Sequence, residues 1–379
     1  MEKPIHEYAD MTIPPNGVAL VPESVDVSLT GCCNLSCEYC CYADSMTTKK
    51  DLPGERWSDI LKELGDIGVQ RLCLSGGEVF VRSDIFTIID DVIKNRMRYS
   101  LLSNGTLINK DTISAFQIGK RRLRLDTIQI SIDGSCAEIH DLSRPPKSFE
   151  RAINALRLLV QAHFPVTVRV TLNHHNINDL PQITALLIDD IGVQGFSTNE
   201  AEFMGTARCN GQNIVLSKDE RKKAMRVLTD LNKQYGGRIG ALAGPLAMAA
   251  AVEEIEKGIA AGETERAGRG TLCSCGGVFS KMAILHDGTM VPCNMLPTLV
   301  MGVAGMHPIQ EAWRSSPAIN AIRYRRFVPL NTLSDCSGCK YIGFCSGGCP
   351  ASVISKTGRL IGTDPTGCYR SFYQEGKFS

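Results

Sequence analysis

The amino-acid sequence predicts an α/β protein: a partial (β/α)6 barrel followed by a small cysteine-rich domain. Short apolar runs alternate with amphipathic helical segments through the first half of the chain, which is the pattern of parallel βαβ units. Eight of the 16 cysteines lie between Cys273 and Cys368, so the end of the chain has a composition of its own. A closed barrel would need two more βα units before that region.

The predicted strands and helices follow one another from residue 24 onward. The strands are expected at 24–29, 70–74, 99–102, 127–132, 166–172 and 195–198. The helices are expected at 56–64, 83–95, 110–116, 148–161 and 178–189, with further helices at 217–236 and at 240–258, the last interrupted near Gly244-Pro245. We therefore expect a lead-in at 1–23, the barrel at 24–215, a helical linker at 216–270 and the cysteine-rich domain at 271–379. Ligands of such units bind at the carboxyl ends of the strands.

Composition excludes several classes of protein. A hydrophobic content of 43% with 21% charged residues is typical of a soluble globular protein. The net charge of +1 gives no electrostatic basis for binding nucleic acid or an anionic membrane. No apolar run reaches the roughly 18 residues of a membrane span, and the first residues lack the apolar core of a signal peptide. Many cysteines without a secretion signal indicate metal binding rather than disulfides, so we expect a cytoplasmic protein.

Three cysteines follow the first predicted strand with the spacing CxxxCxxC. They are Cys33, Cys37 and Cys40. A short loop with this spacing can turn three thiolates towards one centre. Because a [4Fe–4S] cluster has four irons, three cysteines leave one iron free to bind a small molecule. A zinc site in a cysteine-rich chain is the alternative.

With an aromatic residue before its last cysteine, this motif resembles the signature of the radical S-adenosylmethionine (SAM) superfamily. The resemblance implies that Cys33, Cys37 and Cys40 hold the cluster and that SAM chelates the open iron. Electron transfer would then cleave SAM into methionine and a 5′-deoxyadenosyl radical. Tyr39 would lie beside the adenine.

Two further motifs follow predicted strands where this family binds SAM. Gly76, Gly77 and Glu78 follow the second strand, and a Gly-Gly-Glu sequence there would by itself be a plain turn. In the family it holds the amino group of SAM. The segment from Ser131 to Arg144 resembles the SxDG…HDxxR segment of peptide- and protein-modifying members. By resemblance, Ser131 contacts the ribose of SAM and Arg144 its carboxylate.

The C-terminal cysteines resemble the seven-cysteine SPASM extension of radical SAM enzymes, with the order C…GxxxxC…CxxCxxxxxCxxxC…C. This extension implies two auxiliary [4Fe–4S] clusters, and therefore three clusters in the chain. One auxiliary cluster would use Cys336, Cys339, Cys345 and Cys368. The other would use Cys275, Cys293 and Cys349, with either Cys273 or an open iron at its fourth position.

The resemblance favours a peptide substrate, because most relatives with this extension modify peptides or proteins. We expect a thioether or carbon–carbon crosslink, or epimerisation, in a ribosomally made peptide, with flavodoxin or ferredoxin as reductant. Cys209 could then donate a hydrogen atom to a substrate radical. Asn294 stands where sulfatase maturases carry an aspartate, which argues against that activity, and residues 1–23 are too short for a fused leader-peptide-binding domain.

Three alternatives remain open. A haem-pathway side-chain decarboxylase and a small-molecule dehydrogenase would use the same scaffold. A non-catalytic iron–sulfur electron carrier belongs to a different class, and the open-site motif together with Gly-Gly-Glu argues against it.

Overall fold

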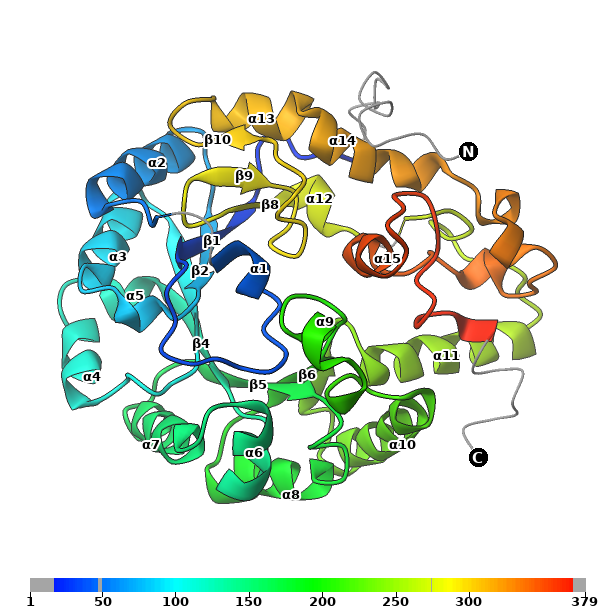
Figure 1. The fold of residues 1–379 in the computed structure, drawn as a ribbon, viewed down its shortest axis with the longest axis horizontal. Coiled ribbons are helices and arrows are strands. Elements are labelled where there is room, and N and C mark those ends of the chain that lie inside the picture. Colours follow the sequence, from blue (N-terminus) through cyan, green and yellow to red (C-terminus); the bar gives the residue numbers. More distant parts are fainter. Residues whose placement is uncertain (1–16, 47–49, 274, 371–379) are drawn as a thin grey trace.

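The computed structural model describes residues 17–46, 50–273 and 275–370. Its centre is one sheet of ten strands, in the order β10-β9-β8-β1-β2-β3-β4-β5-β6-β7, and helices lie around the outside of this sheet (Figure 1). None of the helices in these ranges is long and apolar enough to cross a membrane.

Six parallel strands, paired in chain order, form the barrel. Each lies within two residues of its predicted position, which confirms the barrel. The strands are β1 Ser24–Thr30, β2 Arg71–Gly76, β3 Arg98–Ser103, β4 Leu125–Ser131, β5 Val166–Leu172 and β6 Phe196–Glu200.

The helices between these strands bury one apolar stripe against the sheet. In α2, for example, Trp57, Ile60, Leu61 and Leu64 recur at helical spacing and are all buried. The predicted helix at 178–189 is α-helical only in its first half and continues as a single π-helical turn. The helices of the barrel are α1 Ala43–Met46, α2 Gly54–Asp66, α3 Ile85–Lys94, α4 Lys110–Phe116, α5 Arg121–Arg124, α6 Ala137–Ser143, α7 Ser148–Gln161, α8 Leu180–Ala185, the π-helical turn Leu186–Asp190 and α9 Ala207–Asn210.

The segment after β6 differs from the prediction. Helix α10, Lys218–Gln234, begins with the capping box of Ser217 and Glu220. The helix expected at 240–258, with an interruption near Gly244-Pro245, is helical only after that interruption: strand β7, Ile239–Ala241, comes before it and helix α11, Pro245–Ala260, after it. Proline is tolerated in the first turn of a helix but not in its interior, so α11 begins at Pro245. The residues before it form β7, which pairs in parallel with β6 and adds one strand to the sheet.

The cysteine-rich region continues the barrel sheet. Strand β8, Lys281–Ile284, pairs in parallel with β1, and the antiparallel strands β9, Thr289–Val291, and β10, Gly302–Val303, follow it. The sheet therefore runs across the predicted boundary at residue 271. The remaining helices are α12 Gly277–Ser280, α13 Ile309–Ser315, α14 Pro317–Tyr324 and α15 Pro350–Thr357.

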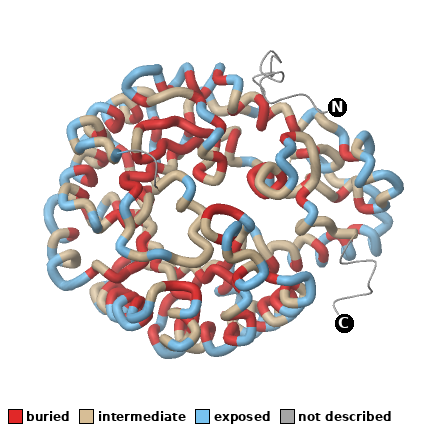
Figure 2. Tube along the Cα trace, in the orientation of Figure 1, coloured by how far each residue is buried: buried red, intermediate tan, exposed pale blue. Residues whose placement is uncertain are grey.

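The two faces of the barrel strands have opposite chemistry. Side chains that face the outer helices are apolar and fully buried, for example Val27, Leu74 and Val170. The alternate side chains point to the inner face of the sheet, and they are mostly polar and partly exposed. They include Asp26, Cys73, Ser100, Gln129, Ser131, Arg169 and Ser197. Figure 2 shows exposed residues along the rim of the molecule and buried residues in the layer beneath it.

Candidate active site

The loop after β1 carries the three cysteines of the CxxxCxxC motif at the carboxyl end of the barrel. Cys33, Cys37 and Cys40 are half-buried, and a negative charge on any of them raises the pKa of a neighbour. Burial raises the pKa of Cys37 to about 11, and Cys40 and Cys33 contribute to the increase. No three potential ligands within the described ranges already converge on one point. Cluster binding is therefore a proposal that rests on this loop and its neighbours.

Three hydrogen-bond donors approach the thiols of this loop. The amide of Leu35 lies 3.4 Å from Cys33 Sγ, and Asn104 Nδ2 lies 3.9 Å from the same sulfur. Arg144 Nη1 lies 3.9 Å from Cys37 Sγ. Donors of this kind stabilise thiolate sulfur in iron–sulfur centres, so the surroundings of the loop fit a cluster.

The segment after β6 braces the same loop. Thr206 donates from its hydroxyl to the Cys37 carbonyl at 2.9 Å and from its amide to the Cys40 carbonyl at 3.2 Å. A Cβ on Gly205 would lie 1.9 Å from the Cys40 oxygen, and Gly205 has φ +53°, so only glycine fits there. The sequence did not predict that this segment contacts the cysteine loop. The local feature that could have indicated it is the Gly205-Thr206 pair.

The glycines of the Gly-Gly-Glu motif pack against the backbone of the cysteine loop. The amide of Gly77 donates to the Thr30 carbonyl at 2.7 Å, and the amide of Glu78 donates to the Cys32 carbonyl at 2.9 Å. A Cβ on Gly76 would lie 2.4 Å from the oxygen of Thr30. The close approach that the sequence suggested for a ligand is thus made, in this structure, by the cysteine loop itself.

Glu78 is fully buried and organises the loop after β3. Its carboxylate accepts hydrogen bonds from Ser103 Oγ at 2.8 Å, the Asn104 amide at 2.7 Å and the Phe80 amide at 3.2 Å. Burial raises its pKa, although these donors oppose the shift. Asn104 in turn donates to Asn34 Oδ1 at 2.9 Å. A hydrogen-bond network therefore connects Glu78 to the cysteine loop, and its predicted contact with SAM stays a prediction.

Asp133 is the centre of a buried group that sequence reasoning missed. Its Oδ2 accepts hydrogen bonds from the Tyr39 hydroxyl and from Arg144 Nε, the latter at 2.5 Å, while the Thr171 amide donates to Oδ1 at 2.7 Å. Asp133 is 0% exposed and Arg144 is 8% exposed. The guanidinium of Arg144 lies 5.5 Å from the centre of the Tyr39 ring. The aspartate therefore holds Arg144 and Tyr39 beside Cys37.

The predicted SAM contacts lie around this group. Tyr39 is in the cysteine loop, Arg144 ends α6, and Ser131 is the last residue of β4. Ser131 lies on the inner face, half-buried and in register with Arg169 of β5. Their individual roles towards SAM remain predictions.

His140 and Asp141 have structural roles near the same group. Asp141 accepts hydrogen bonds from the Lys147 amide at 2.6 Å and the Phe149 amide at 3.1 Å, so it caps the start of α7. The Asp133 amide donates to His140 Nδ1 at 3.0 Å, which requires an unprotonated Nδ1. Burial, with a contribution from Arg144, lowers the pKa of His140 to about 4.

The buried His140 predicts a specific pH dependence of stability. Because its folded-state pKa lies below the usual 6.5, the unfolded state binds more protons between these values, and the free energy of unfolding falls as pH falls from about 6.5 towards 4. This group alone contributes a loss of about 3 kcal/mol over that range. Urea unfolding at pH 7, 6 and 5 should show a shallower pH dependence in His140→Gln than in the wild type. The same slope in both proteins would contradict the assignment.

The C-terminal thiols influence one another within the two sets that the resemblance implies, and their roles as cluster ligands stay predictions. Burial raises the pKa of Cys293 to about 12, and nearby Cys349 and Cys275 contribute. Burial likewise raises the pKa of Cys336 to about 11, with contributions from Cys345, Cys339 and Cys368. Backbone amides also approach these sulfurs, Met295 N to Cys293 at 3.5 Å and Gly347 N to Cys345 at 3.4 Å. Both groups therefore fit the donor pattern of a cluster site.

Cys273 and Cys209 are the two remaining candidate cysteines. Cys273 donates from its sulfur to the Gly268 carbonyl at 2.7 Å. Cys209 is exposed on the short helix α9. Its neighbours Met204 and Arg208 line the cavity described next, and Cys209 is not among the lining residues.

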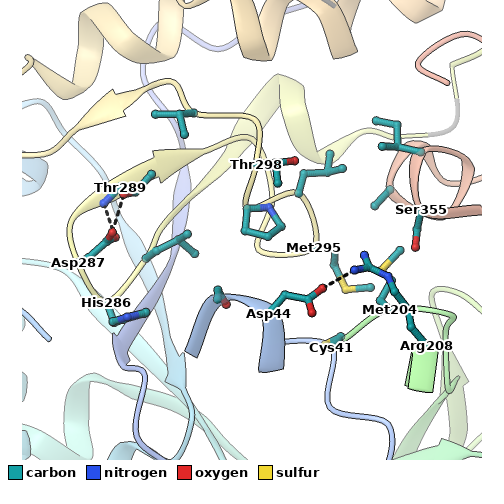
Figure 3. Close-up of a pocket in the computed structure, with 17 residues that line it drawn as sticks. Cys41, Asp44, Met204, Arg208, His286, Asp287, Thr289, Met295, Thr298 and Ser355 are labelled. Carbon is teal, nitrogen blue, oxygen red and sulfur yellow. Dashed lines mark hydrogen bonds and ion pairs between the residues drawn. The ribbon is translucent and has the colours of Figure 1, made fainter. Parts of the chain in front are cut away.

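A cavity of about 380 Å³ lies between the cysteine loop and the C-terminal region (Figure 3). One side is lined by Cys41, which follows Cys40. The other side is lined by Met295 and Ala351, which lie two residues after Cys293 and Cys349. Cys275, Cys293 and Cys349 are called the Cys293 group below. Arg208 Nη1 and Asp44 Oδ2 form an ion pair across it at 2.8 Å. The cavity walls therefore include residues next to candidate ligands from both the cysteine loop and the Cys293 group.

Comparisons with known proteins agree with this geometry. Residues 27–187 match the radical SAM superfamily, and residues 273–340 match the SPASM iron–sulfur cluster-binding domain. An AdoMet-dependent heme synthase of Methanosarcina barkeri is 25% identical over 92% of this chain and 97% of that protein. A PqqA peptide cyclase of Ruegeria pomeroyi is 24% identical over 96% of this chain and 90% of that protein.

Solved structures share the fold. Streptococcus suis SuiB bound to its precursor peptide SuiA has a TM-score of 0.70 at 17% identity, covering 93% of this chain and 77% of SuiB. The anSMEcpe structure with bound AdoMet and the Cp18Cys peptide has a TM-score of 0.66 at 18% identity, covering 89% of this chain and 92% of that one.

Proposed function

This chain is a radical SAM enzyme with a C-terminal SPASM domain, and we propose that it modifies a ribosomally made peptide. The reaction class that we favour is formation of a thioether or carbon–carbon crosslink, or epimerisation. The observation that carries the proposal is the cavity of Figure 3, because its walls include residues next to candidate ligands of two clusters: Cys41 follows Cys40, and Met295 lies two residues after Cys293.

Relatives support a peptide as the substrate. The PqqA peptide cyclases align with nearly the whole chain, and SuiB shares its fold while bound to a precursor peptide. A cavity with methionine and aliphatic walls and one ion pair suits an extended peptide with mixed side chains.

Some residues of the site would bind the cluster, and others position the cysteine loop and the groups around it. When bound and reduced, a [4Fe–4S] cluster on Cys33, Cys37 and Cys40 would supply the electron that cleaves SAM and starts hydrogen abstraction. Arg144 places a positive charge beside Cys37, and Asp133 fixes its orientation. Glu78 holds the loop after β3 against the cysteine loop.

The cofactors of the proposal are SAM and three [4Fe–4S] clusters. The auxiliary clusters would use Cys275, Cys293 and Cys349 in one site and Cys336, Cys339, Cys345 and Cys368 in the other. Cys273 is the candidate for the fourth position of the first auxiliary site after a change of rotamer. A flavodoxin or ferredoxin would deliver the electron.

Iron content and SAM cleavage test this proposal together. We expect anaerobically reconstituted protein to bind roughly twelve irons, and the triple variant Cys33→Ala/Cys37→Ala/Cys40→Ala to bind about eight and produce no 5′-deoxyadenosine. Cys136→Ala removes a cysteine outside the three groups and should change neither quantity. Iron that remains at the wild-type level in the triple variant would contradict the assignment of the loop.

Substrate identity requires a second measurement. A peptide encoded beside the gene should gain or lose a defined mass in a SAM-dependent reaction. The runner-up is side-chain decarboxylation in the haem pathway, which the similarity to the M. barkeri heme synthase favours. Release of carbon dioxide from a tetrapyrrole, with no change in the peptide, would replace the first proposal with the second.

A further inference from the structure

Arg169 is a cation on the inner face of the barrel that has no carboxylate partner. It lies in the middle of β5 between Val168 and Val170, which are fully buried on the outer face, so its side chain points inward. Its Nε donates to Gln129 Oε1 at 3.2 Å. Among the residues that the structure describes, no aspartate or glutamate forms an ion pair with it.

The other cations of the barrel strands lie near a carboxylate. Lys281 Nζ lies 2.9 Å from Asp26 Oδ1. At the amino ends of the strands, Arg98 Nε lies 2.5 Å and Arg71 Nε 3.5 Å from the carboxylate of Asp126, which these two arginines share. Within the described strands, Arg169 is therefore the cation that has no carboxylate at ion-pair distance.

Burial makes an unpaired guanidinium costly. It lowers the pKa of Arg169, while the nearby Cys73 opposes the shift. A partly desolvated guanidinium without a carboxylate partner among the described residues is what an incoming anionic group would satisfy.

The position of Arg169 connects it to the chemistry. It is in register with Ser131 on β4 and with Ser197 on β6. Two residues further along β5, about 7 Å away, Thr171 donates to Asp133. A group bound to Arg169 would thus lie inside the barrel, beneath the buried group of Tyr39, Asp133 and Arg144. Arg169 does not line the cavity of Figure 3, so this group would be a part of the substrate that extends from the cavity into the barrel.

We propose that Arg169 binds the carboxylate of an aspartate or glutamate side chain of the substrate peptide. The planar guanidinium can donate two parallel hydrogen bonds to a carboxylate, and it keeps its charge at any physiological pH. The substrate would therefore carry an acidic residue at or beside the modified position. This inference rests on the proposed function, because it takes the substrate to be a peptide.

Equilibrium dialysis with two capped peptides tests the inference without turnover. The probes are acetyl-Ala-Glu-Ala-amide and acetyl-Ala-Gln-Ala-amide, which differ only in the side-chain charge, and the protein is the cluster-loaded chain with SAM. We expect the wild type to bind the Glu peptide about tenfold more tightly than the Gln peptide. Arg169→Gln should remove this preference and leave SAM affinity unchanged.

Two further variants separate the site from general effects of charge. Arg157→Gln removes an exposed arginine on α7 and should keep the full preference. Arg169→Lys keeps the positive charge but cannot donate two parallel hydrogen bonds, so it should keep only part of the preference for the Glu peptide. This variant also tests the inference if Arg169→Gln does not take up iron. A preference that persists in both Arg169 variants, or is absent from the wild type, would overturn the inference. Loss of SAM binding in Arg169→Gln would overturn it too, because the residue would then belong to the SAM site.

The anion site at Arg169 and the proposed reaction can be contradicted separately, because binding tests the first and turnover tests the second. If no peptide is modified but the Glu preference depends on Arg169, the anion site stands and the proposed reaction does not. If a peptide without acidic residues is modified at the wild-type rate by Arg169→Gln, the proposed function stands and the anion site does not.

Discussion

Asp133→Asn is expected to destabilise the protein by about 3–5 kcal/mol, which is the cost of leaving one partner of a buried ion pair uncompensated. All three donors that approach the Asp133 carboxylate, from Tyr39, Arg144 and Thr171, come from different segments of the chain. An asparagine would present its own NH₂ group to one of these donors and would leave the Arg144 charge unpaired. Because Arg144 also contacts Cys37, we expect SAM cleavage to be lost as well.

Urea unfolding of the anaerobic protein measures the first effect, and the yield of 5′-deoxyadenosine measures the second. Asp190→Asn is the matched control, because it breaks an Asp–Arg pair whose two side chains are 54% and 44% exposed. Exposed pairs contribute at most about 1 kcal/mol, so this variant should unfold nearly as the wild type does. If Asp133→Asn and Asp190→Asn had equal effects, Asp133 would not be the organising residue of the site.

Gly77→Ala is expected to lose the cluster of the cysteine loop. A Cβ at this position would lie 2.1 Å from the carbonyl oxygen and 2.5 Å from the carbonyl carbon of Cys32. Both atoms are backbone, so the clash cannot be relieved by a side-chain rotation, and the cysteine loop must move. Iron content should fall from roughly twelve to about eight, with at least a hundredfold loss of SAM cleavage.

The control for this variant is Gly240→Ala in β7. The nearest atom to a Cβ there is the Phe196 oxygen at 3.9 Å, so the added methyl group has room. This variant should keep both iron and activity. A Gly77→Ala protein with a full complement of iron and normal 5′-deoxyadenosine production would show that the contact between Gly77 and the cysteine loop is not required.

The barrel and the cysteine groups could be predicted because their signals are local. Alternation of apolar runs and amphipathic segments located the six barrel strands to within two residues. The spacing of Cys33, Cys37 and Cys40 indicated one loop, and the order of the C-terminal cysteines indicated two groups. Each of these patterns lies within a short stretch of chain or in an ordered set of spacings, which the sequence displays directly.

Strands β7 and β8 could not be predicted in the same way. Each has only a few residues, and each is a strand because a neighbour, β6 or β1, offers an open edge at that place. A short apolar run next to a glycine or proline is compatible with several local structures. Pairing with a distant edge decides between them, and the sequence does not state which edges meet.

The sequence by itself indicated the resemblance to radical SAM enzymes, the βα order and the cysteines that are candidate ligands. Tertiary structure alone decided which charges are paired. Tyr39 and Asp133 are 94 residues apart and meet in a buried contact, while Arg169, an ordinary strand arginine by sequence, has no carboxylate partner in the part of the chain that the structure describes. The physical reason is that the free energy of a charge depends on its burial and on its partner, and both are set by which segments pack together.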